Sequence, residues 1–210
     1  MKRKPTIRIM LVDDHPAFRK GLAALIASEP DLEVVAEIGD GREVLNCYSQ
    51  KQPDIVLMDL RLPGLGGVEA TLALKQVFPD ARVIVLTTFD LDEDIYRAIQ
   101  SGAKSYLLKD ASEEELAATI RAVFAGEQVL SPKVASQLAA RQHRPELHDR
   151  ELEVLHFLIK GYSNKEMAAD LHLTEDTIKA HLKSLFAKLG VRSRTEAVVV
   201  AIRHGVVHIE

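Results

Sequence analysis

Hydrophobic and polar positions follow one repeating pattern through the first half of the chain. Five short apolar runs predict β-strands, and they span Ile7–Val12, Leu32–Glu37, Ile55–Met58, Arg82–Thr87 and Ser105–Leu108. After each run, apolar residues at helical spacing predict helices over Pro16–Ala27, Arg42–Gln50, Gly67–Val77, Leu91–Ser101 and Ser112–Ala125. Strands that alternate with helices form a parallel sheet that helices cover on both faces. We therefore predict a five-stranded, doubly wound α/β domain of the flavodoxin-like kind over residues 1–125.

Beyond residue 125 the strand pattern disappears. Gly126 and Pro132 mark a connector, and residues 133–144 predict a linker helix that ends near Pro145. The rest of the chain has helical periodicity, with helices predicted over Arg150–Lys160, Asn164–Leu171, Glu175–Leu189 and Thr195–His204. We therefore predict a partly helical linker over residues 126–145 and an all-α, four-helix domain over residues 146–210.

The composition is typical of a globular protein without a membrane span. Hydrophobic residues make up 47% of the chain and charged residues 28%. No run reaches the roughly 18 uninterrupted apolar residues of a membrane helix, and the first five residues do not lead into a signal-peptide core. The single cysteine, Cys47, has no partner for an internal disulfide. We expect a cytoplasmic protein.

The net charge of −4 hides a difference between the two halves of the chain. Residues 1–125 carry 15 basic and 20 acidic side chains, a net charge of −5, whereas residues 126–210 carry 12 and 11, a net charge of +1. The positive charge of the second half is concentrated between positions 175 and 194. This asymmetry predicts different partners for the two domains.

Polar side chains stand at the carboxyl ends of four of the predicted strands. These residues are Asp13, Asp14, Asp59, Thr87 and Lys109. Because the carboxyl ends of parallel strands border one crevice, we expect the five side chains to converge. Three carboxylates in one crevice repel each other unless a cation joins them, and an all-oxygen site suits a hard divalent ion such as Mg²⁺.

Such a site has the parts that phosphoryl transfer to a carboxylate requires. One carboxylate is the nucleophile, while the metal ion and the ammonium of Lys109 neutralise charge on the phosphoryl oxygens. The hydroxyl of Thr87 can donate a hydrogen bond to the attached group. Taken alone, each residue has a structural explanation, for instance a helix cap for Asp13 or Asp14. Five of them at strand ends of one sheet favour a functional site.

Four segments around these residues resemble the signature regions of two-component receiver domains. The segments are Leu11–His15, Leu57–Pro63, Leu86–Thr88 and Leu107–Asp110, and the resemblance spans residues 7–125. It implies that Asp59 takes a phosphoryl group from the phosphohistidine of a histidine kinase. Many receivers have proline where Asp110 follows the lysine here, and this departure leaves the phosphorylation prediction unchanged.

The same resemblance implies roles for the residues around the phosphoacceptor. The implied Mg²⁺ ligands are Asp13, Asp14, Asp59 and the main-chain carbonyl of Arg61. Thr87 and Lys109 would bind the phosphoryl oxygens. Tyr106 stands where the family places an aromatic side chain that rotates inward when Thr87 moves, and a packing role is the alternative. Arg61 and Phe89 flank the site and are expected to tune the lifetime of the acyl phosphate.

The second domain contains a predicted helix-turn-helix. The helices Asn164–Leu171 and Glu175–Leu189 are joined by a short turn, and Thr174 is a favourable N-cap for the latter. One face of that helix carries Lys179, Ala180, Lys183 and Ser184, and the opposite face is apolar, with Ile178, Leu182, Leu185, Phe186 and Leu189. Such a helix can enter the major groove of DNA. A solvated surface is the alternative explanation for the lysines, but the helix-turn-helix spacing favours DNA.

This region resembles the LuxR-type four-helix DNA-binding module over residues 146–208. The segments that carry the resemblance are Arg150–Leu155, Gly161–Ala168 and Thr177–Lys183. It implies base contacts from Lys179, Ala180 and Lys183, and contacts near the DNA backbone from Asn164, Lys165, Thr177, His181 and Lys188. His148 replaces the threonine often found at the start of the module, so the cap of its first helix stays open. Together the two halves resemble the NarL/FixJ family of response regulators.

These resemblances imply a phosphorylation-controlled DNA-binding transcription regulator with Mg²⁺ as cofactor. The implied partners are a histidine kinase, double-stranded promoter DNA and a second copy of the chain on phosphorylation, with RNA polymerase as a further candidate. One module contacts few bases, so specific binding should require a dimer on two half-sites about one helical turn apart.

Two alternatives remain beside this interpretation. A Mg²⁺-dependent phosphatase with an aspartyl nucleophile generally has a second acid two residues further on, where this chain has Arg61. A phosphorylation-independent DNA-binding protein with a vestigial receiver would not need all five site residues. We therefore expect no enzyme beyond self-phosphorylation and self-dephosphorylation at Asp59.

Overall fold

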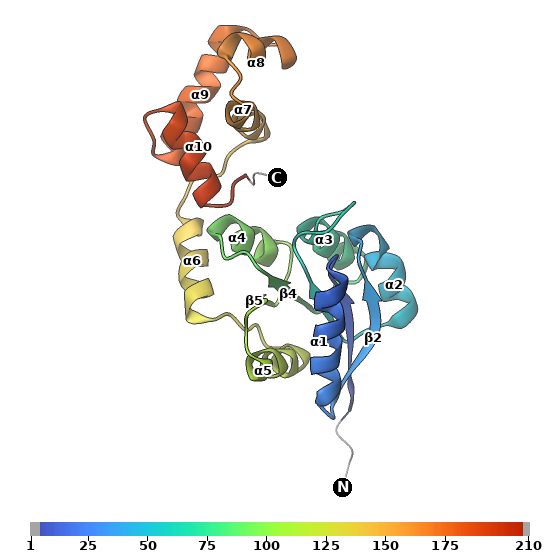
Figure 1. The fold of residues 1–210 in the computed structure, drawn as a ribbon. Coiled ribbons are helices and arrows are strands. Elements are labelled where there is room, and N and C mark those ends of the chain that lie inside the picture. The colour runs from blue at the N-terminus through green and yellow to red at the C-terminus, as the bar shows by residue number, and fades with distance from the viewer. Residues whose placement is uncertain (1–4, 208–210) are drawn as a thin grey trace. The chain divides into compact units, whose positions relative to one another are not determined.

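The structure is a computed structural model and describes residues 5–207. It consists of two compact units (Figure 1). The first takes in residues up to Asp90 and Asp94–Gln137, and the second takes in Leu91–Glu93 and the chain from Leu138 onward. Each unit has its own hydrophobic core. The domain boundaries predicted at residues 125 and 145 stay predictions.

The first unit is built on a five-stranded parallel sheet with the order β2-β1-β3-β4-β5. The strands are β1 (Ile7–Val12), β2 (Leu32–Ile38), β3 (Ile55–Met58), β4 (Val83–Thr87) and β5 (Ser105–Leu108). The order reverses between β1 and β3, so the connections leave these two strands toward opposite faces of the sheet. Doubly wound sheets bind ligands at the carboxyl ends of the strands at this switch point.

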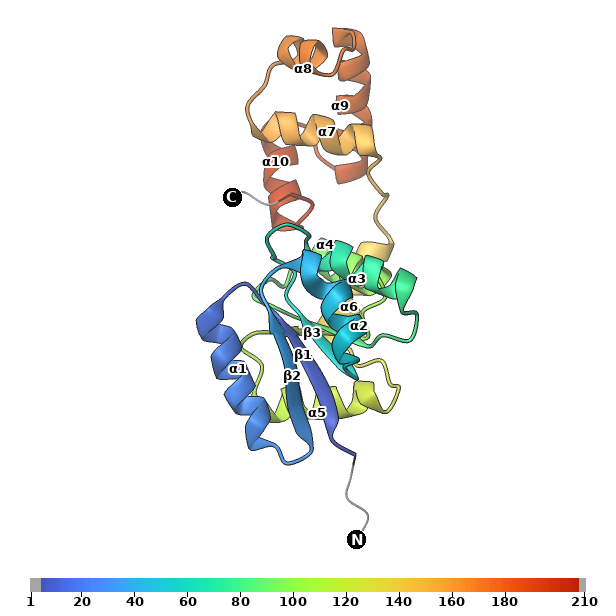
Figure 2. The ribbon, with the colours of Figure 1, turned by 90° about the vertical axis from the view of Figure 1, so that its right-hand side faces the viewer.

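Helices cover both faces of this sheet (Figure 2), as predicted. They are α1 (Pro16–Ser28), α2 (Val44–Lys51), α3 (Gly67–Val77), α4 (Asp92–Gln100) and α5 (Glu113–Phe124). Ile9 and Leu11 of β1 belong to a core shared with α1 and α5. Met10 and Val12 point to the other face and share a core with α2 and α3. The doubly wound α/β fold expected from the sequence is confirmed.

The segment after α5 returns to the edge of the sheet. Val129 forms a parallel bridge with Ser105 of β5, and its N–H donates to the carbonyl of Lys104 at 3.0 Å. Helix α6 (Pro132–Gln142) follows, and the Ser131 hydroxyl accepts a hydrogen bond from the N–H of Val134 in its first turn. This segment therefore begins as an addition to the sheet and continues as a helix.

After α6, the described residues up to 207 form four helices, as the sequence predicts. They are α7 (Asp149–Ile159), α8 (Asn164–Asp170), α9 (Glu175–Leu189) and α10 (Arg194–Arg203). Ser163, Thr174 and Ser193 cap α8, α9 and α10, because each side chain accepts the N–H of the residue three positions later. Buried apolar residues from all four helices form a single core.

Most predicted elements have bounds within one or two residues of those expected. The clearest difference is at α2, because the predicted helix Arg42–Gln50 starts as the 3₁₀ turn Gly41–Glu43 and becomes an α-helix at Val44. The Asp40 carboxylate accepts bonds from the N–H and the guanidinium of Arg42, which hold this tighter turn. Within residues 5–207, none of the helices has the length and apolar character that a membrane crossing requires.

Candidate functional site

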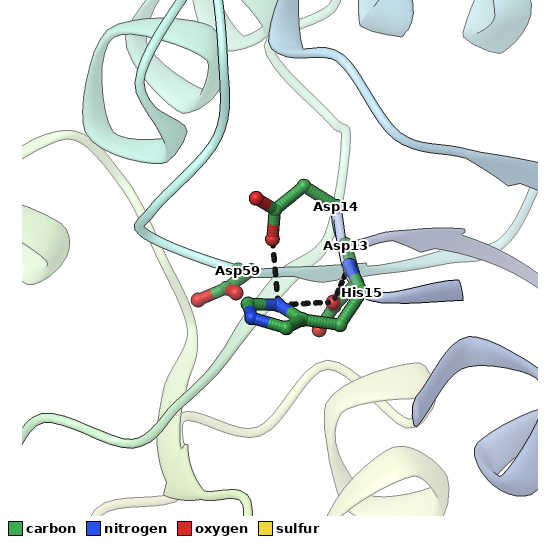
Figure 3. Close-up of side chains that lie close together, drawn as sticks. All are labelled: Asp13, Asp14, His15 and Asp59. Carbon is green, nitrogen blue, oxygen red and sulfur yellow. Dashed lines mark hydrogen bonds and ion pairs between the residues drawn. The ribbon is translucent and has the colours of Figure 1, made fainter. Parts of the chain in front are cut away.

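Three carboxylates lie together at the carboxyl ends of β1 and β3 (Figure 3). Asp13 and Asp14 follow β1, Asp59 follows β3, and together with His15 they place one ligand atom each within 4.8 Å of the others. His15 Nδ1 lies 2.6 Å from Asp14 Oδ1 and 3.3 Å from Asp13 Oδ1. The sequence pointed to the three carboxylates but not to His15. Helix capping does not explain the pair of aspartates, because His15 is the N-cap residue of α1.

The ammonium of Lys109 joins two of these carboxylates. Its Nζ lies 2.6 Å from Oδ2 of Asp13 and 2.6 Å from Oδ2 of Asp59. It also lies 4.7 Å from the centre of the Phe18 ring, an attractive cation–π distance. Burial lowers the pKa of Lys109, but its hydrogen bonds to Asp13 and Asp59 outweigh burial and leave the pKa raised. Lys109 is therefore a cation in this cluster.

Asp59 is the most enclosed carboxylate of the cluster, with 3% of its surface exposed. Burial raises its pKa, the bond and charge of Lys109 oppose this rise, and the charge of Asp13 adds to it. The N–H of Arg61 donates to Asp59 Oδ1 at 3.3 Å. The ionised, nucleophilic form of Asp59 therefore depends on the cations beside it.

The chemistry of this donor set fits a hard divalent cation. Three carboxylates against one ammonium leave two negative charges within a few ångströms. Oxygen ligands of this kind are preferred by Mg²⁺, which binds through one or two carboxylates and keeps several waters. Asp14 is exposed at the rim, where such an ion can enter. The cluster therefore fits the predicted Mg²⁺.

Thr87 and Tyr106 both bond to the loop that follows β4. The buried Thr87 hydroxyl accepts the N–H of Phe89 at 3.4 Å, and the Tyr106 hydroxyl donates to the Phe89 carbonyl at 2.8 Å. Burial raises the pKa of Tyr106, so its hydroxyl stays protonated. The main-chain carbonyl of Thr87 accepts the N–H of Lys109 at 2.8 Å. Lys109 thus connects the end of β4, through this main-chain bond, with the carboxylates of Asp13 and Asp59.

Arg61 and Phe89 flank the site, as the sequence indicated. The guanidinium of Arg61 lies over the Phe89 ring at 4.8 Å from its centre. One of its nitrogens lies 3.8 Å from Asp94 Oδ1 in α4. The main chain of Arg61 bonds to Asp59 and that of Phe89 bonds to Thr87, so this stacked cation and ring lie beside the site.

Gly67, at the start of α3, supports the backbone of Asp59. A Cβ atom at position 67 would lie 2.0 Å from the Asp59 carbonyl oxygen and 2.9 Å from the Leu60 Cα. The N–H of Gly67 donates to the Leu60 carbonyl at 3.0 Å, which fixes this close approach. A side chain at this position would displace the backbone that carries the carboxylate.

In the second unit, α9 presents the predicted contact face. Lys179, Ala180 and Lys183 are exposed, whereas the apolar residues of the opposite face are buried or packed against the core. Lys179 forms an ion pair with Asp176 at 2.8 Å. Of the predicted backbone contacts, Lys165 is exposed, and the rest are half-buried: Asn164, Thr177, His181 and Lys188.

A buried carboxylate in α7 holds α9 in place. Glu151, 3% exposed, accepts bonds at 2.6 Å from Ser184 Oγ and from Lys188 Nζ, both in α9. It also accepts the N–H of His148, the N-cap residue of α7, at 2.9 Å. The start of α7 is thus capped by Glu151 although His148 stands in place of threonine. Burial raises the pKa of Glu151, but the bonds from Lys188, Ser184 and His148 outweigh burial and lower it to about 2. Lys188 also donates to the Glu146 carbonyl.

The start of α10 is tied to the start of α8. Arg194 donates from Nη2 to Asn164 Oδ1 at 2.5 Å and from Nη1 to the Tyr162 carbonyl at 2.9 Å. Asn164, predicted to lie near the DNA backbone, is therefore oriented by a cation from another helix.

Two family profiles match the chain. Residues 9–121 match the response regulator receiver domain, and residues 145–201 match the luxR family of bacterial regulatory proteins. This chain belongs to the response regulators. Both resemblances stated from the sequence are confirmed, and the response regulator is a DNA-binding transcription regulator of a two-component system.

Known proteins similar to this response regulator cover nearly its whole length. The response regulator protein VraR of Staphylococcus aureus (strain Mu3) is 38% identical over 207 residues, which are 96% of this chain and 99% of that protein. The crystal structure of response regulator ChrA of a heme-sensing two-component system is 40% identical, covers 97% of this chain and 100% of that chain, and has a TM-score of 0.59. A complex of the response regulator RcsB with DNA, 24% identical, covers 93% of this chain and 97% of that chain with a TM-score of 0.68, and shares the fold.

Several residues of this response regulator support its sites without having been singled out in the sequence. They are Phe18, Gly67, Glu151 and Arg194. Phe18, Glu151 and Arg194 contact residues 30 or more positions away, and Gly67 admits the backbone of Asp59 and Leu60, so the role of each depends on the tertiary fold. Ser184 was expected on the same face as Lys183; it is exposed, and its hydroxyl bonds to Glu151.

Proposed function

We propose that Asp59 is the phosphoacceptor of this response regulator. An Asp59 oxygen attacks the phosphorus of the phosphohistidine of a histidine kinase, the N–P bond breaks, and the imidazole keeps its electron pair. The observation that carries this proposal is the burial of Asp59 between a cation and two further carboxylates at the switch point of the sheet. Lys109, freed from Asp59, stabilises the transferred oxygens.

Mg²⁺ fits the same cluster as the cofactor of this transfer. Asp13, Asp14, Asp59 and the main-chain carbonyl of Arg61 would hold it, and it would neutralise the negative charge of the incoming phosphoryl group. Residues of the chain do the rest, since Lys109 binds one oxygen and the Arg61 and Phe89 pair tunes the lifetime of the acyl phosphate. The chemistry stays within phosphorylation and dephosphorylation of Asp59, and no other substrate is converted.

Thr87 is the switch residue in this proposal. Its hydroxyl leaves the Phe89 N–H and donates to an oxygen of the phosphoryl group on Asp59. Tyr106 follows, because its hydroxyl bonds to the same loop through the Phe89 carbonyl. A charge change at Asp59 is thus converted into a change of shape at the surface around β4 and β5.

In the DNA-binding step, α9 is the recognition helix. Lys179, Ala180 and Lys183 face base edges in the major groove. The residues near the DNA backbone are Asn164, Lys165, Thr177, His181 and Lys188. Lys188 is already bonded to Glu151 and Glu146, so its contact with phosphate is the weakest member of this set.

Phosphorylation then promotes a homodimer that reads two half-sites of promoter DNA, with RNA polymerase as a further partner. A second copy supplies a second α9, and the affinity for a two-site operator rises with dimer formation. The expected contact surfaces of the dimer are α1 and α5 in the first unit and α10 in the second.

The decisive test is mass spectrometry of the full chain treated with acetyl phosphate and Mg²⁺. We expect one added phosphoryl group on the peptide that contains Asp59, and none in Asp59→Asn. Asp80→Asn, a change at an exposed aspartate, is the matched control and should be phosphorylated like the wild type. An unmodified wild-type peptide would refute the assignment.

Light scattering and DNA-binding measurements on the same samples test the consequence. We expect the molar mass to double and the affinity for a two-site operator duplex to rise after phosphorylation. Unchanged mass and unchanged affinity of a fully phosphorylated sample would refute the dimerisation step alone.

A further inference from the structure

Helix α6 is bonded to the loop that follows β4. Lys133 Nζ lies 2.6 Å from Asp90 Oδ2, and Gln137 Nε2 donates to the main-chain carbonyl of Asp90 at 2.6 Å. Asp90 stands only three residues after Thr87. The bond to Asp90 raises the pKa of Lys133, so the ammonium is charged at neutral pH. We call these three residues, Asp90, Lys133 and Gln137, the α6 latch.

The packing beneath the latch is incomplete. Val134 of α6 is 7% exposed and lines a cavity of about 210 Å³ together with Ile95 of α4 and Tyr106 of β5. Val134 is the only apolar side chain of α6 that is buried, and the other apolar residues of this helix are partly or fully exposed. Helix α6 therefore depends on the polar bonds to Asp90 more than a closely packed helix would. A displacement of Asp90 would therefore weaken the attachment of α6 to this surface.

The residue before Asp90, Phe89, is bonded to both Thr87 and Tyr106. The N–H of Phe89 donates to the Thr87 hydroxyl, and the carbonyl of Phe89 accepts from the Tyr106 hydroxyl. When Thr87 turns toward Asp59, the bond to the Phe89 N–H breaks, and Tyr106, which follows Thr87 in the proposed switch, carries with it the Phe89 carbonyl and the peptide unit that leads to Asp90. Both bonds of the latch have Asp90 as acceptor, one through its side chain and one through its main chain. A shift of Asp90 would therefore weaken both bonds.

We propose that the α6 latch senses the phosphorylation state of the receiver: it holds α6 on the loop after β4 while Asp59 is unmodified and opens when the phosphoryl group draws Thr87 away. This inference rests on the proposed phosphorylation of Asp59. The opening releases the segment that leads to the DNA-binding module. By reciprocity, a chain whose latch is removed binds the phosphoryl group more favourably.

Hydrogen exchange of the full chain, followed by mass spectrometry, measures the latch directly. Without a phosphodonor, the amides of α6 should exchange about fivefold faster in Lys133→Ala and in Gln137→Ala than in the wild type, the lower end of coupling between linked sites. Ser136→Ala is the matched control, because Ser136 is exposed on the same helix, and it should exchange like the wild type. Equal exchange in all four proteins would overturn the latch.

Addition of acetyl phosphate and Mg²⁺ then separates this inference from the proposed function. In the wild type we expect phosphorylated Asp59 and α6 exchange as fast as in the two latch variants, which should show little further change. A wild type that is phosphorylated at Asp59 but keeps slow exchange in α6 overturns the latch and leaves the phosphoacceptor intact. A wild type that gains no phosphoryl group overturns both.

Beryllofluoride, an analogue of the phosphoryl group, gives an independent readout. In the presence of Mg²⁺, Lys133→Ala and Gln137→Ala should bind it about fivefold more tightly than the wild type and Ser136→Ala. Equal affinities in the four proteins contradict the coupling between α6 and Asp59.

Discussion

The carboxylate of Glu151 in α7 lies 2.6 Å from the ammonium of Lys188 in α9. The glutamate is buried, and the same carboxylate accepts a second bond from α9 through Ser184. The orientation of α9 relative to α7 is therefore fixed by a buried carboxylate between the two helices. A side chain that never reaches DNA can in this way determine how the base-contacting face is presented.

Replacement of Glu151 by glutamine should destabilise the second unit by about 2 kcal/mol, because bonds to a buried charge are lost and Lys188 loses its charged partner. Chemical denaturation at neutral pH, observed by circular dichroism, measures this change. The control is Glu153→Gln on the same helix, where an exposed ion pair with Arg150 contributes little. A Glu151→Gln protein as stable as the control would contradict the role given to the pair.

The stability of the second unit should fall in acid because of the same carboxylate. The pKa of Glu151 is lowered from 4.5 to about 2 in the folded protein, so the unfolded chain takes up a proton first as the pH falls. The stabilisation is complete above about pH 4.5 and is lost progressively toward pH 2. Denaturation midpoints from pH 6 to pH 3 should therefore converge for the wild type and Glu151→Gln. Parallel curves would show that Glu151 titrates normally.

Alanine at Gly67 should destabilise the first unit by about 1–3 kcal/mol, the usual cost of overpacking, and slow phosphorylation of Asp59. The new Cβ would collide with the Asp59 carbonyl oxygen, a backbone atom that cannot move away alone. Gly21→Ala is the matched control: nothing lies within 4 Å of its Cβ, and alanine within a helix should stabilise by roughly 0.5–1 kcal/mol. Urea denaturation and the rate of phosphate incorporation provide the two measurements.

Replacement of Lys109 by methionine should strengthen Mg²⁺ binding while it abolishes efficient phosphoryl uptake. The ammonium shares the carboxylates of Asp13 and Asp59 with the ion, and its removal should raise the affinity about tenfold. Titration calorimetry with MgCl₂ measures the change. Lys51→Met is the control, since Lys51 precedes β3 at the opposite end of the sheet. Weaker binding in Lys109→Met would show that the lysine assists the ion.

Two lysines of the second unit should affect DNA binding in different ways. Lys183→Ala should lower the affinity for the operator by about 1–3 kcal/mol and relax its specificity, because Lys183 faces bases in our proposal. Lys165→Ala should weaken binding to every duplex alike and reduce the salt slope by about one. Fluorescence anisotropy at several salt concentrations distinguishes the two patterns. Lys160→Ala, an exposed change at the end of α7, should alter neither.

The sequence predicts the sheet well because its pattern is local. The uniformly apolar run Ile55–Met58 became the central strand β3, buried on both faces. The meeting of Asp13, Asp14, Asp59 and Lys109 was also predictable, since strand ends of a doubly wound sheet meet at one edge. The helices of the second unit followed from periodicity and from caps such as Thr174.

The partners of individual polar side chains could not be predicted in the same way. Ser184 lies one helical turn after Ala180 and was assigned to the same face, but its hydroxyl reaches Glu151, 33 residues away. The bond between Lys133 and Asp90 spans 43 residues. Such pairs depend on how whole elements pack, and neither spacing nor composition contains that information. The need for glycine at position 67 was equally unpredictable, because only the packed fold shows that the backbone of Asp59 and Leu60 leaves no room for a Cβ atom there.

Val129 also changes how the chain should be divided for study. It lies after the α/β domain predicted for residues 1–125, yet it covers the outer edge of β5. A recombinant fragment that stopped at residue 125 would expose that edge. The unpaired main-chain groups of an exposed edge strand promote aggregation. Fragments that run to residue 137 should behave as well-dispersed monomers where the shorter ones precipitate.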